Sequence, residues 1–475
     1  MSLCAGSSSR TDKPNFKHMR KGKRLALMAL AATAFLGSCK KTHEQDIIAQ
    51  GEVDYDTPLR TLLEEMGGSD GLNYFVLPES DDYASIPQDP LNPITSYKVE
   101  LGKLLFHETG IATNPKLETE GFGTYSCASC HHAQGGFQAN RQQGVGEGGI
   151  GFGAAGEGRT IHPAYDLESL DVQPIRTPTA MNGAYQKVML WNGQFGATGP
   201  NLDTEDLWPP GTPIWNNHFG HEGLETQAIA GLTVHRLVVD EDLCESVELY
   251  HDLFDIAFQE FPVENRYTER TAGLAVAAYE RTMLSNQAPF QEWLRGDNTA
   301  MSDAQKRGAE IFFGKADCAS CHNGPALNDM DFYALGMPDL VGPGVYAGTG
   351  AEGAAQGRGG FTGEDEDMYK FKTPQLYNLK DSPFYGHGGT FHSVREVVEY
   401  KNNGESANAI VPASQLAEQF VPLNLSDDEI SDLVDFIENA LYDADLMRYV
   451  PDALPTGQCF PNNDAVSQID QGCVQ

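Results

Sequence analysis

Two copies of one five-residue string, Cys-Ala-Ser-Cys-His, stand at residues 127–131 and 318–322. Two thiols at this spacing can form thioethers to both vinyl groups of one haem, and the adjoining histidine can then bind the iron. Each string therefore predicts a covalent haem c site. The predicted attachment and iron-binding residues are Cys127, Cys130, His131, Cys318, Cys321 and His322.

A zinc site or a disulfide is the alternative interpretation of a Cys-x-x-Cys pair. A zinc ribbon needs two such pairs about 15 to 20 residues apart, and it needs no histidine after each pair. Here Cys127 and Cys318 begin strings in different halves of the chain, and both strings end in histidine. The doubled match therefore favours haem over zinc.

The N-terminus is typical of an exported protein. A basic cluster at 20–24 precedes an apolar run at 25–36, which is too short to span a bilayer and suits a signal-peptide core. Leu-Gly-Ser-Cys at 36–39 resembles a bacterial lipoprotein box, in which Cys39 carries a lipid anchor, and an ordinary secretory signal cut nearby is the alternative. Met19 stands where a start codon would give a signal peptide of ordinary length. We expect a periplasmic protein that is anchored to a membrane by its lipid.

The remaining cysteines agree with export, because covalent haem attachment and persistent disulfides belong outside the reducing cytoplasm. Cys459 and Cys473 lie close together in a tail rich in Pro, Asn and Asp, and are predicted to form a disulfide. Cys244 is left over and is expected to be buried.

The chain is strongly acidic, with 32 Lys and Arg against 67 Asp and Glu, for a net charge of -35. Removal of residues 1–38 takes away seven basic residues and one acidic residue, which leaves a net charge of about -41. This charge argues against a nucleic-acid partner and favours the attraction of a small basic protein such as a cytochrome c. The alternative is that the acidity only keeps an exported protein soluble.

Short amphipathic helices are predicted before each string and again far behind it. Ser302 is the predicted N-cap of a helix that ends at Gly314, just ahead of the second string. Ser-Asp-Asp-Glu at 426–429 is a capping box, and apolar residues follow it at helical spacing as far as Leu441. The corresponding helices of the first half are expected at 97–106 and 267–284.

Gly-rich stretches at 144–158 and 342–363 show no apolar period and are predicted to be loops. The expected fold is mainly α, with two tandem cytochrome c-like domains and long Gly-rich loops. The expected segments are a signal peptide (1–38), an N-terminal extension (39–90), an N-terminal cytochrome c domain (91–296), a C-terminal cytochrome c domain (297–450) and a disulfide-bearing tail (451–475).

Further motifs surround the two strings, and together they resemble those of bacterial dihaem cytochrome c peroxidases and their relatives that mature methylamine dehydrogenase. The resemblance runs from about Leu101 to Asp443. It implies that peroxide meets the haem on His131, and that the haem on His322 receives electrons. The motifs are Leu-Gly-Lys-Leu-Leu-Phe at 101–106, Arg-Thr-Pro-Thr at 176–179, Leu-Trp-Asn-Gly at 190–193, Leu-Glu-Thr-Gln-Ala at 224–228, Phe-Lys-Thr-Pro-Gln-Leu at 371–376 and His-Gly-Gly at 387–389.

The resemblance also implies roles for single residues. Trp191 matches a tryptophan between the haems that can bridge the electron path, and a core tryptophan is the alternative. Gln227 matches a glutamine that hydrogen-bonds bound peroxide, and a helix-surface amide is the alternative. His387 resembles a histidine near the propionates of the second haem, whereas His132 is expected to be exposed.

The first haem site departs from the family pattern at two positions. The glutamate that carries the proton is missing, since residues 228–237 contain no carboxylate, and His235 stands nearest to its place. A neutral histidine can carry that proton, and a buried structural histidine is the alternative. The histidine that often closes this haem is replaced by Glu147. Glu147 is either a proton carrier or a solvated acid in a flexible glycine loop.

The second haem site departs from the family as well. Its usual methionine or tyrosine ligand follows the His-Gly-Gly motif, where this chain has Glu-Tyr-Lys-Asn at 399–402 and no methionine. Tyr400 is the candidate axial ligand, which would lower the haem potential, and a packed helical tyrosine is the alternative. A calcium ion often lies between the haems of this family, but Arg176 replaces its asparagine ligand, which puts calcium in doubt.

The expected function is the reduction of hydrogen peroxide to water, a two-electron reaction for which two haems in one chain provide the redox centres. The expected electron donor is a small cytochrome c or cupredoxin, and the resemblance also implies a homodimer. One alternative is an enzyme that uses the same high-valent haem pair to oxidise side chains of a partner protein. The other is a non-catalytic electron carrier whose irons are both six-coordinate.

Overall fold

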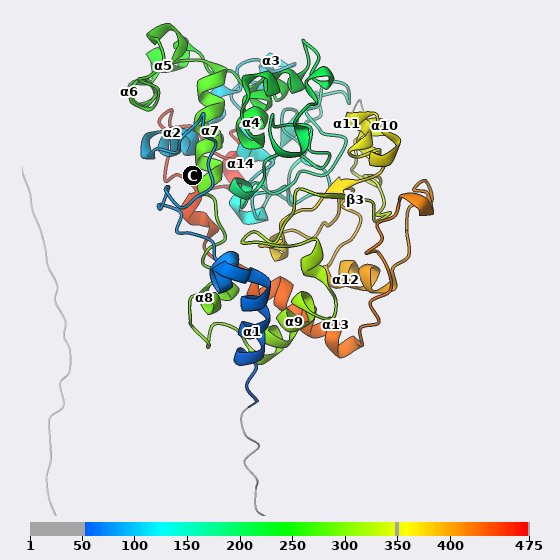
Figure 1. Ribbon diagram of the computed structural model, residues 1–475. Coiled ribbons are helices and arrows are strands. Elements are labelled where there is room, and N and C mark those ends of the chain that lie inside the picture. The colour runs from blue at the N-terminus through cyan, green and yellow to red at the C-terminus, as the bar shows by residue number, and fades with distance from the viewer. Residues whose placement is uncertain (1–52, 347–350, 474–475) are drawn as a thin grey trace, which may run out of the picture. The chain divides into compact units, whose positions relative to one another are not determined.

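A computed structural model describes residues 53–346 and 351–473. Helices dominate these residues, and the strands are short antiparallel pairs, β1 with β2 and β3 with β4 (Figure 1). The predicted mainly α fold is therefore confirmed. The Gly-rich stretches are not loops throughout, because 342–363 contains the short helices α10 and α11 and 144–158 contains the strand β1. In chain order the elements are α1 (Asp56–Gly67), α2 (Ser96–His107), α3 (Glu118–Gly121), β1 (Gly149–Ile150), β2 (Thr160–Ile161), α4 (Gly223–Val234), α5 (Glu241–Ser246), α6 (Glu248–Ala257), α7 (Glu269–Thr282), α8 (Pro289–Leu294), α9 (Asp303–Phe313), β3 (Phe332–Tyr333), α10 (Ala351–Ala355), α11 (Gly359–Thr362), β4 (Phe371–Lys372), α12 (Val394–Asn403), α13 (Asp427–Asp435) and α14 (Ala465–Asp470).

The helices predicted around the two strings are present. The side chain of Ser302 caps α9 by accepting a hydrogen bond from the Gln305 amide. Ser426 and Glu429 form the predicted capping box of α13. The closing helix changes character before its predicted end, because a π-helical turn at Phe436–Ala440 follows α13.

In each half a glycine lets the helix before the string touch the helix that comes later in the sequence. A Cβ atom at Gly102 of α2 would lie 2.0 Å from the Ala275 carbonyl oxygen of α7. A Cβ atom at Gly308 of α9 would lie 2.0 Å from the Asp432 carbonyl oxygen of α13. Any side chain at either position would therefore push the two helices apart.

The buried apolar side chains of the described residues gather in two cores. One core is built mainly on α2, α4, α6 and α7, and the other on α1, α8, α9 and α13. Leu59 and Leu63 of α1 belong to the second core, although they come from the predicted N-terminal extension. Tyr449, near the predicted end of the C-terminal domain, packs into the first core. The chain thus crosses between the cores at both ends, and the predicted domain limits stay a prediction.

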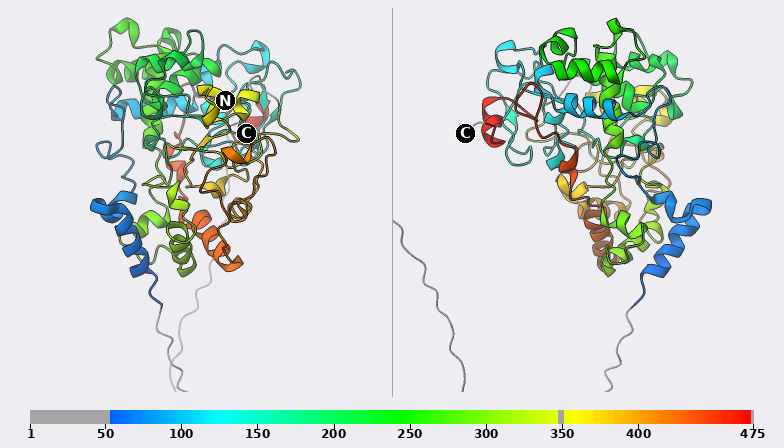
Figure 2. Two further views of the ribbon diagram at one scale, coloured as in Figure 1. Left: turned by 45° about the vertical axis from the view of Figure 1, so that its right-hand side comes forward. Right: turned by 90° about the vertical axis from the view of Figure 1, so that its left-hand side faces the viewer.

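The C-terminal tail packs against the first haem string. Cys459 and Cys473 form the predicted disulfide, and Asn462 accepts a 2.6 Å hydrogen bond from the hydroxyl of Ser129 within the string. Asp470 of α14 accepts 2.8 Å bonds from two amides of the loop at 144–158. Figure 2 shows α14 beside the loops of the first half.

The structure tests the prediction about Cys244, but not the predictions about the signal peptide and the lipid anchor. Cys244 is buried, as predicted. Within residues 53–346 and 351–473, no helix is long and apolar enough to cross a membrane. The predicted signal peptide, Met19 and the lipid site at Cys39 lie outside the described residues.

Candidate haem sites

The second string forms one 3-10 turn, Cys318–Ser320, directly behind α9. The Nδ1 atom of His322 lies 3.1 Å from both the Leu327 and Pro374 carbonyl oxygens. Because a carbonyl only accepts, Nδ1 carries the proton, which leaves Nε2 with a free lone pair for a metal ion. Burial lowers the pKa of His322 to about 4, so the ring is neutral at physiological pH.

A cavity of about 290 Å³ opens beside this string, and its wall is largely apolar. Both halves of the chain contribute to the wall, the first through Pro178, Met189 and Trp191, and the second through Phe371 and Phe420. An apolar wall that carries two thiols and a neutral imidazole fits a haem held by thioethers and a histidine. The residues present therefore fit the predicted group.

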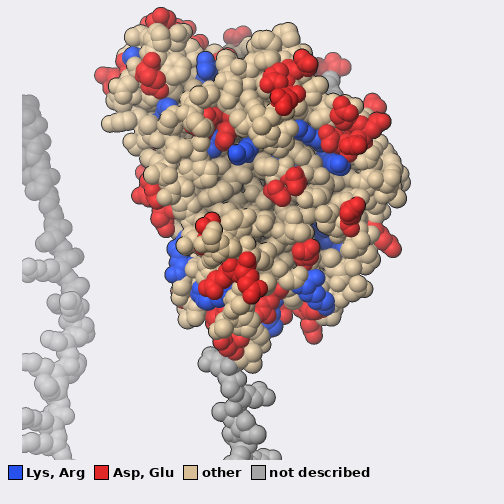
Figure 3. Space-filling view, viewed as in Figure 1, with Lys and Arg blue, Asp and Glu red and all other residues tan. Residues whose placement is uncertain are grey.

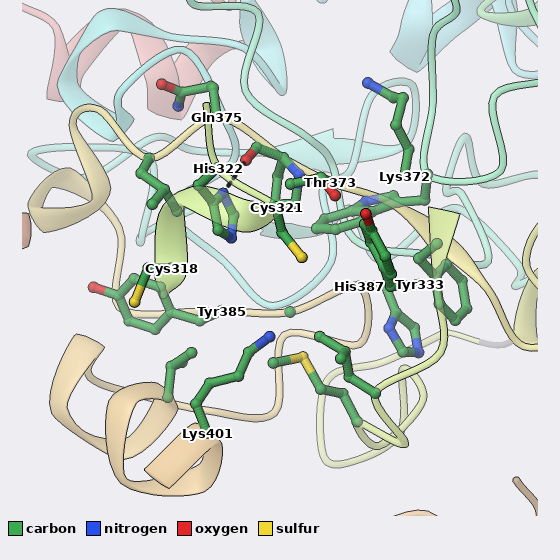
Figure 4. Close-up of a pocket in the computed structure, with 18 of the residues that line it drawn as sticks. Cys318, Cys321, His322, Tyr333, Lys372, Thr373, Gln375, Tyr385, His387 and Lys401 are labelled. Atoms are coloured by element: carbon green, nitrogen blue, oxygen red, sulfur yellow. Dashed lines mark hydrogen bonds between the residues drawn. The ribbon is translucent and has the colours of Figure 1, made fainter. Parts of the chain in front are cut away.

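Figure 4 shows which side chains face this cavity. Cys318, Cys321 and His322 lie on one side, and Lys401 reaches in from α12 on the other side. Tyr400 is not part of the wall: its hydroxyl donates a 2.6 Å hydrogen bond to the Leu335 carbonyl, and its ring lies against Phe391 and Phe420. The prediction of Tyr400 as axial ligand is therefore contradicted. The structure agrees with the alternative, in which Tyr400 is a packed residue of the helix.

The first string repeats this arrangement as the 3-10 turn Cys127–Ser129. His131 Nδ1 donates to the Phe137 carbonyl over 3.1 Å, and burial lowers the pKa of His131 to about 4. Its neutral ring also keeps Nε2 free for iron. The expectation that His132 is exposed is wrong: its ring is buried against Phe152, and its Nε2 lies 2.9 Å from the Ala155 carbonyl.

Gln227 and His235 are two helical turns apart, in the second turn and just past the end of the same helix, α4. Residues spaced by four lie on one face of a helix, so Gln227, Gly231 and His235 share a face. Gly231 leaves this face open, since a Cβ atom there would lie 4.0 Å from Gln227 Nε2. His235 contacts Asp171, whose carbonyl accepts a 2.9 Å hydrogen bond from the Gly146 amide. A Cβ atom at Gly144 would lie 2.9 Å from Cys130 Sγ, so this segment adjoins the first string.

Asp171 orients the His235 ring. Its two carboxylate oxygens lie 2.8 and 3.0 Å from His235 Nδ1. The Nδ1 proton therefore points at the carboxylate, and Nε2 is left as the basic atom. Burial alone would lower the pKa of His235, but the charge and hydrogen bond of Asp171 outweigh burial and raise it. No local pattern around Asp171 predicted this pair, because the two residues are far apart in the sequence.

Glu147 is fully buried, so the interpretation as a solvated acid in a glycine loop is wrong. Its carboxylate accepts hydrogen bonds from the Lys116 amide at 2.5 Å and the Tyr165 hydroxyl at 2.7 Å. It also pairs with the guanidinium of Arg236, the residue next to His235. These bonds make Glu147 a positioning residue for the end of α4, and its role as a proton carrier finds no support in this geometry.

Trp191, Arg176 and His387 form a junction between the two halves, in which Arg176 and His387 are buried and Trp191 is half-buried. Trp191 Nε1 donates to the Arg176 carbonyl over 2.8 Å, and the Trp191 ring lies edge-on to His387 with a centroid distance of 6.3 Å. His387 stacks on Phe371 at 3.7 Å and contacts Asp339 through Nε2 at 3.1 Å. Trp191 and His387 both line the cavity of the second string. The structure thus brings together the two residues that the resemblance singled out for this region.

The Arg176 side chain places a positive charge at the junction. Its guanidinium donates to the Gln138 side chain at 2.6 Å, the Ser382 hydroxyl at 2.9 Å and the Arg141 carbonyl at 3.1 Å. Burial lowers the pKa of Arg176 to about 9, so the group still carries its charge near neutral pH. A fixed cation at this position disfavours a second cation beside it.

Comparisons with known proteins agree with this geometry. A sequence model described as Di-haem cytochrome c peroxidase matches residues 96–299. A methylamine utilization protein MauG from Methylorubrum extorquens is 30% identical over 358 residues, which cover 74% of this chain and 81% of that protein. A cytochrome-c peroxidase IdrP1 from Denitromonas iodatirespirans is 30% identical over 373 residues, which cover 74% and 83%.

The fold is also found among solved structures. A MauG-like protein associated with microbial copper homeostasis superposes with a TM-score of 0.51 at 22% sequence identity, over 78% of this chain and 96% of that chain. The resemblance inferred from the motifs is confirmed, and the family implies two haem c groups. The chain belongs to the di-haem cytochrome c peroxidase family, which includes MauG.

Proposed function

We propose that this chain reduces hydrogen peroxide to water with electrons from a small cytochrome c or cupredoxin. One haem c would be attached to Cys127 and Cys130 and bound by His131, and the other to Cys318 and Cys321 and bound by His322. When bound, the two haems supply the iron centres that exchange electrons with peroxide and with the donor. The observation that carries the proposal is the His235–Asp171 pair, which adjoins the first string through the segment at 144–146.

The His235–Asp171 pair can move the proton that peroxide cleavage requires. The neutral Nε2 of His235 can take the proton from the peroxide oxygen that is nearer to the haem and return it to the oxygen that is farther away. Asp171 holds the ring in the required tautomer and stabilises it while it is protonated, as a carboxylate does for a catalytic histidine. Gln227, on the same face of α4, offers an amide that can hydrogen-bond the peroxide oxygens. A pure electron carrier needs neither group.

We further propose that the donor is cationic. Acidic side chains gather in several patches on the face shown in Figure 3, in a chain whose net charge is -35. Such a surface attracts a basic donor and speeds its association at low ionic strength. We also propose export to the periplasm with a lipid on Cys39, assembly as a homodimer, and a junction in which Arg176 takes the place of calcium.

The turnover of the purified dihaem protein tests this proposal. We expect steady consumption of hydrogen peroxide with reduced cytochrome c, and a high-spin ferric signal from an open haem in the electron paramagnetic resonance spectrum. Oxidation of a partner protein's side chains without turnover of cytochrome c would instead support the first alternative. If both irons are six-coordinate and low-spin, and neither reacts with peroxide in the oxidised or the half-reduced state, the protein is an electron carrier and the proposal is wrong.

On acidification, peroxidase activity should fall at a higher pH than it would if the proton carrier were a histidine with the ordinary pKa. The reaction needs neutral His235, and Asp171 raises the pKa of this ring above its ordinary value. Replacement of Asp171 by Asn removes the charge that raises the pKa, so burial dominates and the acidic limb of kcat/KM should move to lower pH. The pH profiles of the wild type and the variant measure this shift. An unchanged acidic limb in Asp171→Asn would contradict the assignment of that limb to His235.

A further inference from the structure

Lys401 is the one side chain labelled in Figure 4 that enters the second cavity from α12. Its ammonium group points toward the side that carries Cys318, Cys321 and His322. Neighbours on a helix are about 100° apart, so Tyr400 packs away from the cavity while Lys401 faces it.

The lysines that are buried among the described residues have oxygen partners. Lys98 Nζ lies 3.1 Å from Asn92 Oδ1, Lys306 Nζ lies 2.9 Å from an Asp56 oxygen, and Lys372 Nζ contacts Gln186 Oε1. Lys401 is half-buried and makes no hydrogen bond or ion pair with any residue of 53–346 or 351–473, although it lines a largely apolar cavity. A charged amine without a partner is costly there, whereas a neutral amine has a lone pair for a metal ion.

We propose that Lys401 Nζ is the axial ligand, opposite His322, of the haem held by the second string. This inference rests on the proposed haem in that cavity and names its sixth ligand. Two nitrogen ligands would close this iron to peroxide and leave the first site, beside His235, as the place of reaction. They would also hold the potential of the second haem below that of a histidine–methionine pair, because a methionine ligand raises the potential.

Met337 is the competing ligand, because it also lines the cavity. Its sulfur lies 3.2 Å from the position of a Cβ atom at Gly386, which places it against the loop that carries His387. The test therefore compares Lys401→Ala, Lys401→Met and Met337→Leu in the intact dihaem protein. Tyr400→Phe is the matched control, since it alters the neighbouring residue on the same helix and leaves the wall of the cavity unchanged.

The readouts are the electron paramagnetic resonance spectrum, the near-infrared magnetic circular dichroism band that distinguishes amine from thioether ligation, and the midpoint potential. We expect amine ligation in the wild type, in Met337→Leu and in Tyr400→Phe. Lys401→Ala should lose this signature and let the second haem bind added cyanide. Lys401→Met should replace the signature by that of a thioether and raise the potential of the second haem.

Covalent haem content, measured by intact mass, separates a failure of this inference from a failure of the proposed function. A chain with fewer than two haems would contradict the proposed function itself. With two haems attached, an unchanged amine signature in Lys401→Ala and Lys401→Met would overturn the ligand assignment. So would a thioether signature in the wild type that disappears in Met337→Leu.

Discussion

Replacing His235 with alanine should lower kcat for peroxide reduction by about 100- to 10 000-fold, the usual contribution of a positioned proton carrier. The His235 ring is the basic group on the open face of α4, and its Nδ1 atom lies 2.8 Å from the Asp171 carboxylate, which holds the Nδ1 proton. Without the ring, the proton must pass through water that nothing orients. Stopped-flow reduction of peroxide by the pre-reduced dihaem protein measures this step without the donor reaction.

His251→Gln is the matched control for this variant. His251 lies on α6 and stacks on Tyr267, and 46% of its side chain is exposed, so its loss should leave kcat within about twofold of the wild type. The haem absorption spectra should be the same in all three proteins, which excludes a loss of haem as the cause. A value of kcat in His235→Ala within about tenfold of the wild type would contradict the role of His235 as proton carrier.

The attachment residues could be predicted because their geometry is local. Two thiols and a histidine within five residues determine one haem site, and no distant contact is needed to place them. The capped helices α9 and α13 were predictable for the same reason, since Ser302 and Ser426 each bond an amide three residues further on. Local patterns thus gave most of the fold class and both iron-binding histidines.

The residues that lie across each haem site from His131 or His322 are positioned by contacts that no local pattern reveals. Tyr400 and Lys401 are neighbours, and only the packing of α12, through Val394 and Val398, decides which of them faces the cavity. The partner of His235 comes from a loop 64 positions away. Glu147 stands in a sequence rich in glycine, yet Tyr165 and Arg236 from distant segments bury it. The glycine-rich composition predicted that Glu147 is exposed to solvent, but contacts with distant segments bury it.

The second large effect should come from the buried ion pair that joins α4 to α7. Arg281 of α7 is fully buried and bonds both carboxylate oxygens of Glu225 on α4, at 2.7 and 2.8 Å. Arg281 also reaches Glu222, at 3.2 Å. Arg281→Met leaves the buried carboxylate of Glu225 without its counterion, so the free energy of unfolding should fall by about 3 to 5 kcal/mol. Urea unfolding of the dihaem protein, followed by circular dichroism, measures the loss.

Lys315→Met is the control for a surface pair. Lys315 contacts Glu429 at 2.7 Å, but 48% of its side chain is exposed, so its replacement should cost about 1 kcal/mol or less. Glu225→Gln added to Arg281→Met should recover part of the loss, because it removes the unpaired charge. Since Glu225 lies two residues before Gln227 on α4, the pair also holds the helix that carries Gln227 and ends at His235. A loss in Arg281→Met no larger than in Lys315→Met would show that this helix is positioned by its apolar contacts alone.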